Sequence, residues 1–445
     1  MDLSAAFLFL DEKEKEISSG KAEISFNAIS IKLRPETGES IMFSFRDIAT
    51  FEPADYKVRI SLATGEAVLL SELGYKYEDF LRLFNKNRNA LIIKDLLMSE
   101  SLKKAGVESE YEYFSEEGRS LQKGNCEVIL YDTALVVVPE KAELARIPYA
   151  EITGFSAGDH EFTVKTEFDG KYVFSKMGRQ TDPFNRKFSD IQNDLSERVQ
   201  EAIKSIFPEA GPSVLRKAAG FFKDGKAAKK CDVFGISPEL WKRFEEKIGE
   251  TELKEEYAFL KSLARQEKIC VGMKKELANA SGGGEYIWYL IPVYGLDGKT
   301  GGNAIAMESI TSTAEGKGKA TYFFKIAPRK DLEKFKTEAA FDKQVDLVIT
   351  AINRCMLAIN FRRQPIFLPD AKLNEPKYEK YKFAIQKIPG LKILRSYFIG
   401  RVVHIEDTQW QNDVKSLLKF NVGTKNDDAR WLKGDLEDTD IDSDE

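Results

Sequence analysis

Two histidines and four cysteines are the residues of this 445-residue chain best suited to nucleophilic or metal chemistry. The cysteines are Cys126, Cys231, Cys270 and Cys355, and none of them forms a CxxC pair. His160 and His404 lie in different halves of the chain. A zinc ribbon needs closely paired ligands, and a disulfide scaffold needs a short chain rich in cysteine. The pattern argues against both, predicts no metal site and no cofactor, and is typical of a reducing cytoplasm.

Glu308 and Lys325 are a second candidate for chemistry, because they fall on neighbouring predicted strands. A metal-dependent nuclease holds Mg²⁺ with several carboxylates beside a lysine at strand ends. The run Phe323-Phe324-Lys325 carries no second acid at the expected spacing. We therefore expect Glu308 to be a cross-strand partner of Lys325. The glycine-rich stretch 281–284 resembles a phosphate loop only in glycine content, since it lacks the Lys-Ser/Thr ending.

Two basic segments, 214–230 and 354–404, are candidate anion-binding surfaces. The first reads as a short basic amphipathic helix, and the second interleaves basic and aromatic residues, as in proteins that hold a phosphate backbone and stack bases. The alternative for the first segment is a docked surface helix and loop, and the alternative for the second is a solvated helix surface with the aromatic residues buried beneath it. The candidate anion contacts are Lys223, Lys226, Lys229, Lys230, Arg362, Arg363, Lys380, Lys382, Arg395 and Arg401.

The C-terminal residues 435–445 carry seven acids and no base. Such a run repels itself, so we expect it to be disordered. We also expect that it can contact the basic segment and compete there with an anionic ligand. Whole-chain charge hides this polarity, because the formal net charge of −5 is mild.

The N-terminal half of the chain contains an internal repeat, which predicts the first of the secondary-structure elements that position the candidate residues. Residues 22–91 align without a gap on residues 126–195, a spacing of 104, with 14 identities over 70 positions. Chance would give about 4. The shared positions include Gly74 with Gly178 and Phe84 with Phe188, and the apolar phase is kept throughout. The repeat therefore predicts two copies of one fold.

Each copy begins with alternating apolar runs and ends with an amphipathic stretch. The alternation has the period of half-buried strands, and the stretch has the period of a helix. Such a helix can plug the open end of a strongly bent antiparallel sheet. The short apolar run 5–10 is too short for a signal peptide, and we read it as a strand or edge that packs on the first copy.

Small antiparallel sheets that each end in one helix, in tandem, resemble the pleckstrin-homology-like (PH-like) superfold, which includes GRAM and bacterial PH-type domains. The resemblance rests on this element order and on aligned pairs such as Phe51 and Phe155. It implies binding of a lipid headgroup, a peptide or a protein. Phosphoinositide-binding members carry a basic cluster in the first hairpin. Only Lys32 and Arg34 stand there in the first copy, and the second copy has none, which favours a protein partner.

The whole chain is expected to be α+β, of two to four domains. We predict PH-like domains at 1–100 and 122–208 with a linker at 101–121. A helical connector at 209–280 and a C-terminal α+β domain at 281–425 with an antiparallel sheet follow, before an acidic tail at 426–445. Predicted strands there are 285–293, 303–310 and 320–326, and one long helix spans 331–360.

The sequence favours a non-catalytic cytoplasmic scaffold that binds a protein partner through the tandem PH-like domains. The alternative is an anion-binding module for nucleic acid or an acidic membrane surface, which would lose affinity steeply as salt rises. An enzyme, such as a metal-dependent nuclease in the C-terminal domain, comes third. Partner identity and oligomeric state stay open. No stretch approaches the ~20 apolar residues of a membrane-spanning helix.

Overall fold

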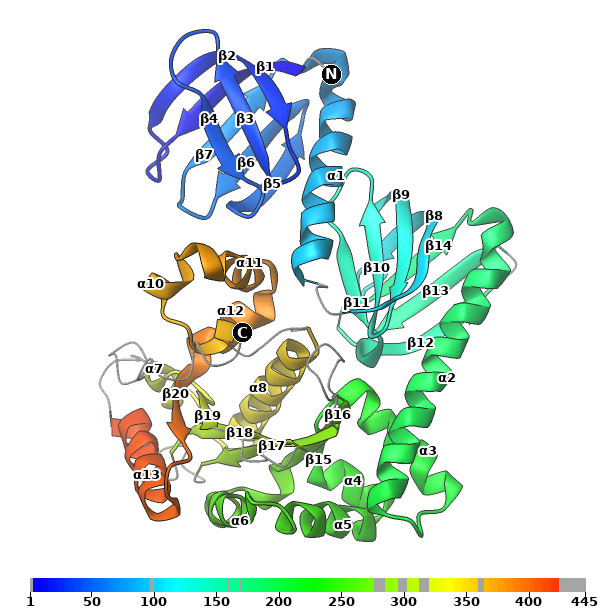
Figure 1. Cartoon of the computed structure of the whole chain (residues 1–445), viewed down its shortest axis with the longest axis vertical. Helices are drawn as coiled ribbons and strands as arrows, with labels where there is room; N and C mark the ends of the chain where they lie inside the picture. Colours follow the sequence, from blue (N-terminus) through cyan, green and yellow to red (C-terminus); the bar gives the residue numbers. More distant parts are fainter. Residues whose placement is uncertain are drawn as a thin grey trace. The chain divides into compact units, whose positions relative to one another are not determined.

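The computed structural model shows an α+β protein whose chain clusters into two compact units (Figure 1). Unit 1 comprises Met1–Ile191 and Leu373–Lys387, and unit 2 comprises Gln192–Lys372 and Ile388–Glu445. The structure describes residues 3–96, 100–158, 160–168, 170–275, 285–294, 302–311, 320–358 and 364–423. The glycine-rich stretch 281–284, Arg362, Arg363 and the acidic tail lie outside the described residues, so the expectations for them stay predictions.

The first copy, here called module 1, is a seven-stranded antiparallel sheet followed by one helix. Its strand order is β4-β3-β2-β1-β7-β6-β5. The strands are β1 (Leu3–Leu10), β2 (Glu16–Phe26), β3 (Ser30–Pro35), β4 (Ile41–Ser44), β5 (Ile48–Ala54), β6 (Lys57–Leu62) and β7 (Ala67–Ser71), and helix α1 spans Tyr77–Leu96. The predicted N-terminal strand is confirmed, but β1 is central in the sheet, because it pairs with both β2 and β7.

The second copy, module 2, repeats this arrangement in the order β11-β10-β9-β8-β14-β13-β12. Its elements are β8 (Leu102–Phe114), β9 (Ser120–Tyr131), β10 (Ala134–Pro139), β11 (Ala145–Pro148), β12 (Ile152–Ala157), β13 (Glu161–Thr166), β14 (Lys171–Ser175) and helix α2 (Thr181–Ile206). The predicted linker 101–121 is therefore wrong in its secondary structure, since most of it is β8. Buried Val107, Ser109 and Tyr111 alternate there with glutamates, and these acids hid the period-two pattern.

The spacing of 104 holds from the strands through to the helix. Strand β3 starts at Ser30 and β10 at Ala134, and α1 starts at Tyr77 and α2 at Thr181. The register shift between β5 and β6 recurs at the equivalent place between β12 and β13. The sequence repeat is thus a structural repeat without insertions, as expected.

Aligned residues have the same task in both copies. Phe84 and Phe188, one on each closing helix, have an exposed fraction of 0%. Phe84 stacks on Phe51 and Phe188 meets Phe155 edge to face. Gly74 and Gly178 precede the helices with φ of +57° and +58°, a conformation that L side chains disfavour. These identical residues therefore set the turn before the closing helix and the packing of that helix against its sheet.

Unit 2 is built around a third sheet of six strands in the order β15-β16-β17-β18-β19-β20. The strands are β15 (Ala228–Lys229), β16 (Cys270–Lys275), β17 (Glu285–Val293), β18 (Ala304–Thr311), β19 (Ala320–Lys325) and β20 (Phe398–Val403). The paired strands are antiparallel throughout. Three predicted strands are confirmed here, one of them, β17, with the same bounds.

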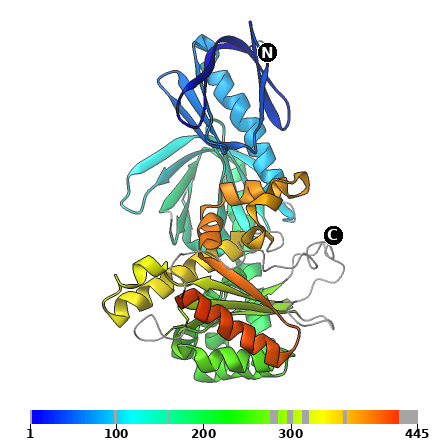
Figure 2. The ribbon, with the colours of Figure 1, turned by 90° about the vertical axis from the view of Figure 1, so that its left-hand side faces the viewer.

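Helices lie on both faces of this sheet (Figure 2). The helices that follow α2 along the chain are α3 (Pro212–Phe221), α4 (Lys230–Ile236), α5 (Pro238–Gly249), α6 (Lys254–Leu263), α7 (Arg329–Leu332), α8 (Glu338–Ala358), α9 (Gln364–Phe367), α10 (Asp370–Leu373), α11 (Glu379–Lys387), α12 (Pro389–Tyr397) and α13 (Asp407–Gly423). Helix α11 belongs to unit 1 and is not one of the helices on this sheet. The side chains of α3, α5, α6 and α13 share one apolar cluster with the sheet.

Two helix predictions need correction. The expected helix 331–360 is broken into α7 and α8, because Thr337 starts a new helix: its hydroxyl accepts the N–H of Ala340 at 3.2 Å. The basic helix expected within 214–230 ends at Phe221, and Asp224 has a positive φ of +51°. Helix α5 begins in the same way as α8, since the hydroxyl of Ser237 accepts the N–H of Leu240.

None of the described helices is both long enough and apolar enough to cross a lipid bilayer.

Candidate functional site

A buried polar cluster lies against the third sheet, where three strands and one helix meet. His404, which follows β20, contacts Glu308 of β18 through Nε2 at 2.9 Å and Glu256 of α6 through Nδ1 at 3.2 Å. Thr321 of β19 donates its hydroxyl to Glu308 at 2.5 Å. The imidazole ring of His404 also stacks on Trp410. All of these side chains are almost fully buried.

The two glutamates set the charge of His404. Burial lowers the pKa of the imidazole, but the hydrogen bonds and negative charges of Glu256 and Glu308 outweigh it and raise the pKa to about 9. The imidazolium is therefore present at neutral pH. Because the folded pKa exceeds the unfolded one, this contribution to stability is complete below the ordinary pKa of 6.5 and is lost as pH rises past about 9.

The contacts of this cluster follow the order of a hydrolase triad. The hydroxyl of Thr321 lies 3.2 Å from Nε2 of His404, whose Nδ1 faces Glu256. However, the exposed fraction of Thr321 is 0%, and its hydroxyl is already bonded to Glu308. A nucleophile needs room for a substrate atom about 3 Å away. The cluster therefore joins strands and helix and offers a substrate no access to its hydroxyl in this conformation.

The expected pairing of Glu308 with Lys325 is wrong. Lys325 stands opposite Ala304, whereas Glu308 stands opposite Tyr289 and bonds Thr321. Four residues along β18 separate Ala304 from Glu308, or about 13 Å at the rise of a strand. Within the described ranges, no group of three or more His, Cys, Asp or Glu residues is placed to hold a metal ion.

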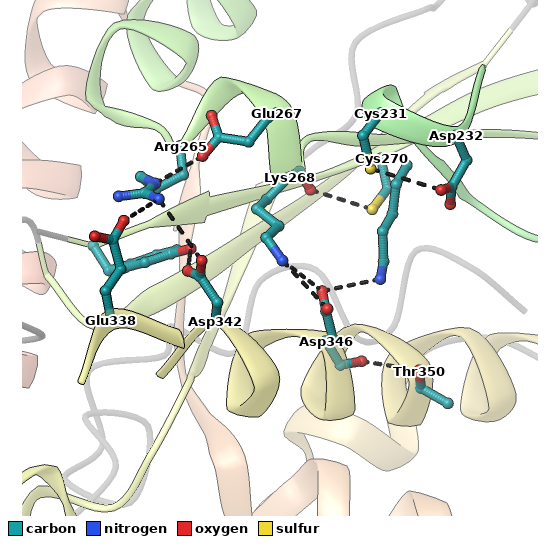
Figure 3. Close-up of polar contacts among 12 residues, drawn as sticks. Cys231, Asp232, Arg265, Glu267, Lys268, Cys270, Glu338, Asp342, Asp346 and Thr350 are labelled. Carbon is teal, nitrogen blue, oxygen red and sulfur yellow. Dashed lines mark hydrogen bonds and ion pairs between the residues drawn. The ribbon is translucent and has the colours of Figure 1, made fainter. Parts of the chain in front are cut away.

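The first basic segment is bound into unit 2 (Figure 3). Lys229 and Lys268 both meet Asp346 of α8, at 2.9 and 3.2 Å. One turn earlier on α8, Asp342 accepts the hydroxyl of Tyr294, and Glu338 meets Arg265 at 2.5 Å. Acids spaced four residues apart thus lie on one face of α8, and bases near β15 and β16 neutralise them. Lys229 therefore fastens a helix to a sheet edge.

The other lysines of this segment are also partly covered. Burial lowers the pKa of Lys223 to about 8, although Asp224 opposes the shift. Lys226 is half-buried, and Lys230 lies over the ring of Trp241 at 5.9 Å. Lys223 and Lys226 flank a turn, Lys229 is on β15, and Lys230 starts α4. The four lysines therefore do not share one helix face.

The second basic segment divides between the two units. Buried Arg395 donates to the carbonyl of Leu368 at 2.9 Å and to Asp370 at 2.8 Å, and Arg401 lies over the ring of Phe367. Both belong to unit 2, whereas Lys380 and Lys382 stand on α11 in unit 1. Their role as anion contacts stays a prediction.

Sequence reasoning missed a charged platform on α1, defined by Arg46, Arg88, Asp95 and Glu143. Arg46 bonds Asp95 through Nε at 2.6 Å and Nη2 at 3.1 Å, and buried Arg88 meets Glu143 at 3.0 Å. Arg88 also donates to the carbonyls of Phe45 at 2.8 Å and Ile48 at 3.0 Å. One signal in the sequence could have indicated this platform: the polar run from Asn85 to Asn89 lies on a helix that was expected to face a core.

Helix α11 lies on this platform, although it comes from the C-terminal half of the chain. Glu379 at its first residue accepts from Arg46 Nη1 at 2.7 Å. Lys387 at its last residue donates to Glu143 at 2.5 Å. Burial and the positive charge of Arg88 lower the pKa of Lys387 despite the attraction of Glu143. The platform thus binds a protein helix by both of its ends.

Comparisons with known proteins add little to this geometry. No protein-family model matches the chain, and no curated protein matches it significantly. A solved structure described as the Spt16D Pob3N heterodimer aligns with 37% of this chain and 83% of its own chain, at 18% sequence identity and a TM-score of 0.15. At this identity and TM-score the match carries no weight for function.

Proposed function

We propose that this chain is a non-catalytic interaction protein whose tandem modules bind a protein partner. The observation that carries the proposal is the binding of α11 to the platform. A helix more than 280 residues along the chain from α1 is held by ion pairs at both ends. A surface that already binds a helix of its own chain has the chemistry to bind one of another protein.

The polar groups elsewhere support a non-catalytic role. The cluster of His404 has the contacts of a triad but buries its hydroxyl. Among the predicted anion contacts, Lys229 and Arg395 meet acids of their own unit. The strand order of both modules supports the PH-like resemblance, which implies binding of peptides or proteins.

The test is site-specific photo-crosslinking of the full chain in an extract of its own cells. Benzoylphenylalanine replaces Met42, which is 67% exposed on edge strand β4, four residues before Arg46 in the sequence. The matched control replaces Ile405, which is 82% exposed in unit 2. We expect a discrete protein adduct from position 42 that survives 0.5 M salt and is absent from position 405.

The competing anion-binding function predicts a different result. The chain would bind heparin or phosphatidylserine vesicles, with affinity falling about 10³-fold or more between 50 and 200 mM salt. Such binding, together with no adduct from position 42, would overturn the proposed function. Equal adducts from positions 42 and 405 would also overturn it, because they would show that the modules are not the binding surface.

A further inference from the structure

Helix α11 carries its two ion pairs with the platform and a buried aromatic residue on a single stripe. Glu379, Phe383 and Lys387 are spaced by four residues and therefore share one helix face. Phe383 is buried, with an exposed fraction of 1%. The acid stands at the N-terminal end and the base at the C-terminal end, about 12 Å apart, which also suits the helix dipole. The stripe therefore reads acid, aromatic, base.

The platform beneath α11 is electrostatically complete without the helix. Arg46 keeps two hydrogen bonds to Asp95, and Arg88 keeps its ion pair with Glu143. Removal of α11 therefore leaves no buried charge unpaired on the modules. An unpaired buried charge is what makes the breaking of a buried ion pair costly. The ion pairs that α11 adds involve residues that are already paired: Glu379 uses Nη1 of Arg46, and Lys387 shares Oε2 of Glu143 with Arg88.

The charged ends of the helix also lose little on release, so that the burial of Phe383 is the main contribution that release gives up. Glu379 is 46% exposed even when bound, so it is largely hydrated already. Lys387 is 8% exposed, and it regains hydration when it leaves. Burial holds the pKa of Lys387 below its ordinary value, which means that the seat disfavours its charge. The charged contacts between α11 and the platform therefore allow the helix to leave the platform and return to it.

We propose that α11 is an intramolecular stand-in for the partner, and that the partner docks on the platform through a helix with the same acid, aromatic and base stripe. This inference rests on the proposed function and names the class of partner. Binding requires α11 to leave, so α11 competes in cis at the high effective concentration of a tethered ligand.

The experiment measures binding of a fluorescent peptide, residues 375–389 of this chain, to three full-length proteins by polarisation. The first is the wild type. The second carries Glu379→Lys and Lys387→Glu, which repels α11 from the intact platform. The third is the matched control, Glu375→Lys with Lys380→Glu, which makes the same exchange of charges off the stripe. Equal thermal melting of the three confirms that they fold.

We expect the second protein to bind the peptide at least about tenfold more tightly than the wild type or the control. A peptide with both stripe charges reversed should lose this gain. Equal peptide affinities for all three proteins would overturn the inference. If the photo-crosslink from position 42 persists in that case, the proposed function survives without α11 as the stand-in, and if no crosslink forms, both fail.

Discussion

The two modules share one architecture and differ in what their closing helices face. In module 2, α2 continues to Ile206 and places Ile203 in the apolar core of unit 2. In module 1, the equivalent surface of α1 is polar. Arg88 and Asp95 correspond to Gln192 and Val199. The same helix thus extends a core in one copy and forms a charged platform in the other.

Identical residues can therefore have different tasks. Asn89 and Asn193 align, but Asn89 is buried and accepts the N–H of Leu144 at 3.0 Å, whereas Asn193 is exposed. Glu39 and Glu143 align as well, and only Glu143 meets an arginine. The difference teaches that shared residues in a repeat report the fold where they face the core of their own module, as Phe84 and Phe188 do, and can differ in role where they face outward.

The largest test of the shared architecture is removal of the aligned core aromatics. Phe84→Ala and Phe188→Ala should each lower the free energy of unfolding of their own module by about 3–5 kcal/mol, because a fully buried ring leaves a cavity. Hydrogen exchange of the strands in each module measures the two effects separately. A loss confined to one module for both variants would break the equivalence.

The next test concerns the residue that most distinguishes the two copies. Arg88→Met should lower the free energy of unfolding by about 2–3 kcal/mol, because it leaves the buried carbonyls of Phe45 and Ile48 without their hydrogen-bond donor. Gln192→Met, at the equivalent place in module 2, should change stability by less than about 0.5 kcal/mol. Urea unfolding of the full chain gives both values. Similar costs would contradict the distinct role of α1.

Glycine at the start of the closing helix gives a smaller and matched effect. Gly74→Ala and Gly178→Ala should each cost about 1 kcal/mol, because both residues have positive φ. Nothing lies within 4 Å of a Cβ at either position, so the cost is confined to the backbone. Thermal melting checks the pair, and unequal shifts would show that the two turns differ.

The smallest effect is a dependence on acid. Burial raises the pKa of Glu143, but the positive charges and hydrogen bonds of Lys387 and Arg88 outweigh it and hold this pKa below its ordinary value of 4.5. Stability from this carboxylate is therefore present above pH 4.5 and lost as pH falls through the folded pKa. Glu143→Gln should lower stability at pH 7 by under about 1 kcal/mol and weaken its fall in acid. Glu39→Gln should leave the urea midpoint unchanged at both pH values.

The sequence was sufficient for features that depend on local period and on self-similarity. The spacing of 104 and the aligned phenylalanines predicted two equivalent modules, and branched and aromatic residues predicted β17 with its bounds. Strand β8 was missed because its exposed face is acidic. The platform was missed because Arg46 and Glu379 meet only in the folded chain, across 333 residues, and no local pattern records such a contact.

The unbroken spacing of the repeat also bears on how the chain reaches its native state. Tandem copies of one fold can exchange strands during folding, and β1 and β8 hold the same central place in their sheets. However, β8 begins five residues before the equivalent of β1 and pairs onward to Tyr131, opposite Leu102. Strand β1 ends its pairing at Leu3 with Ile24. The ladder between β8 and β9 is therefore longer than the one between β1 and β2, and an exchange of the two strands would leave its extra pairs unformed.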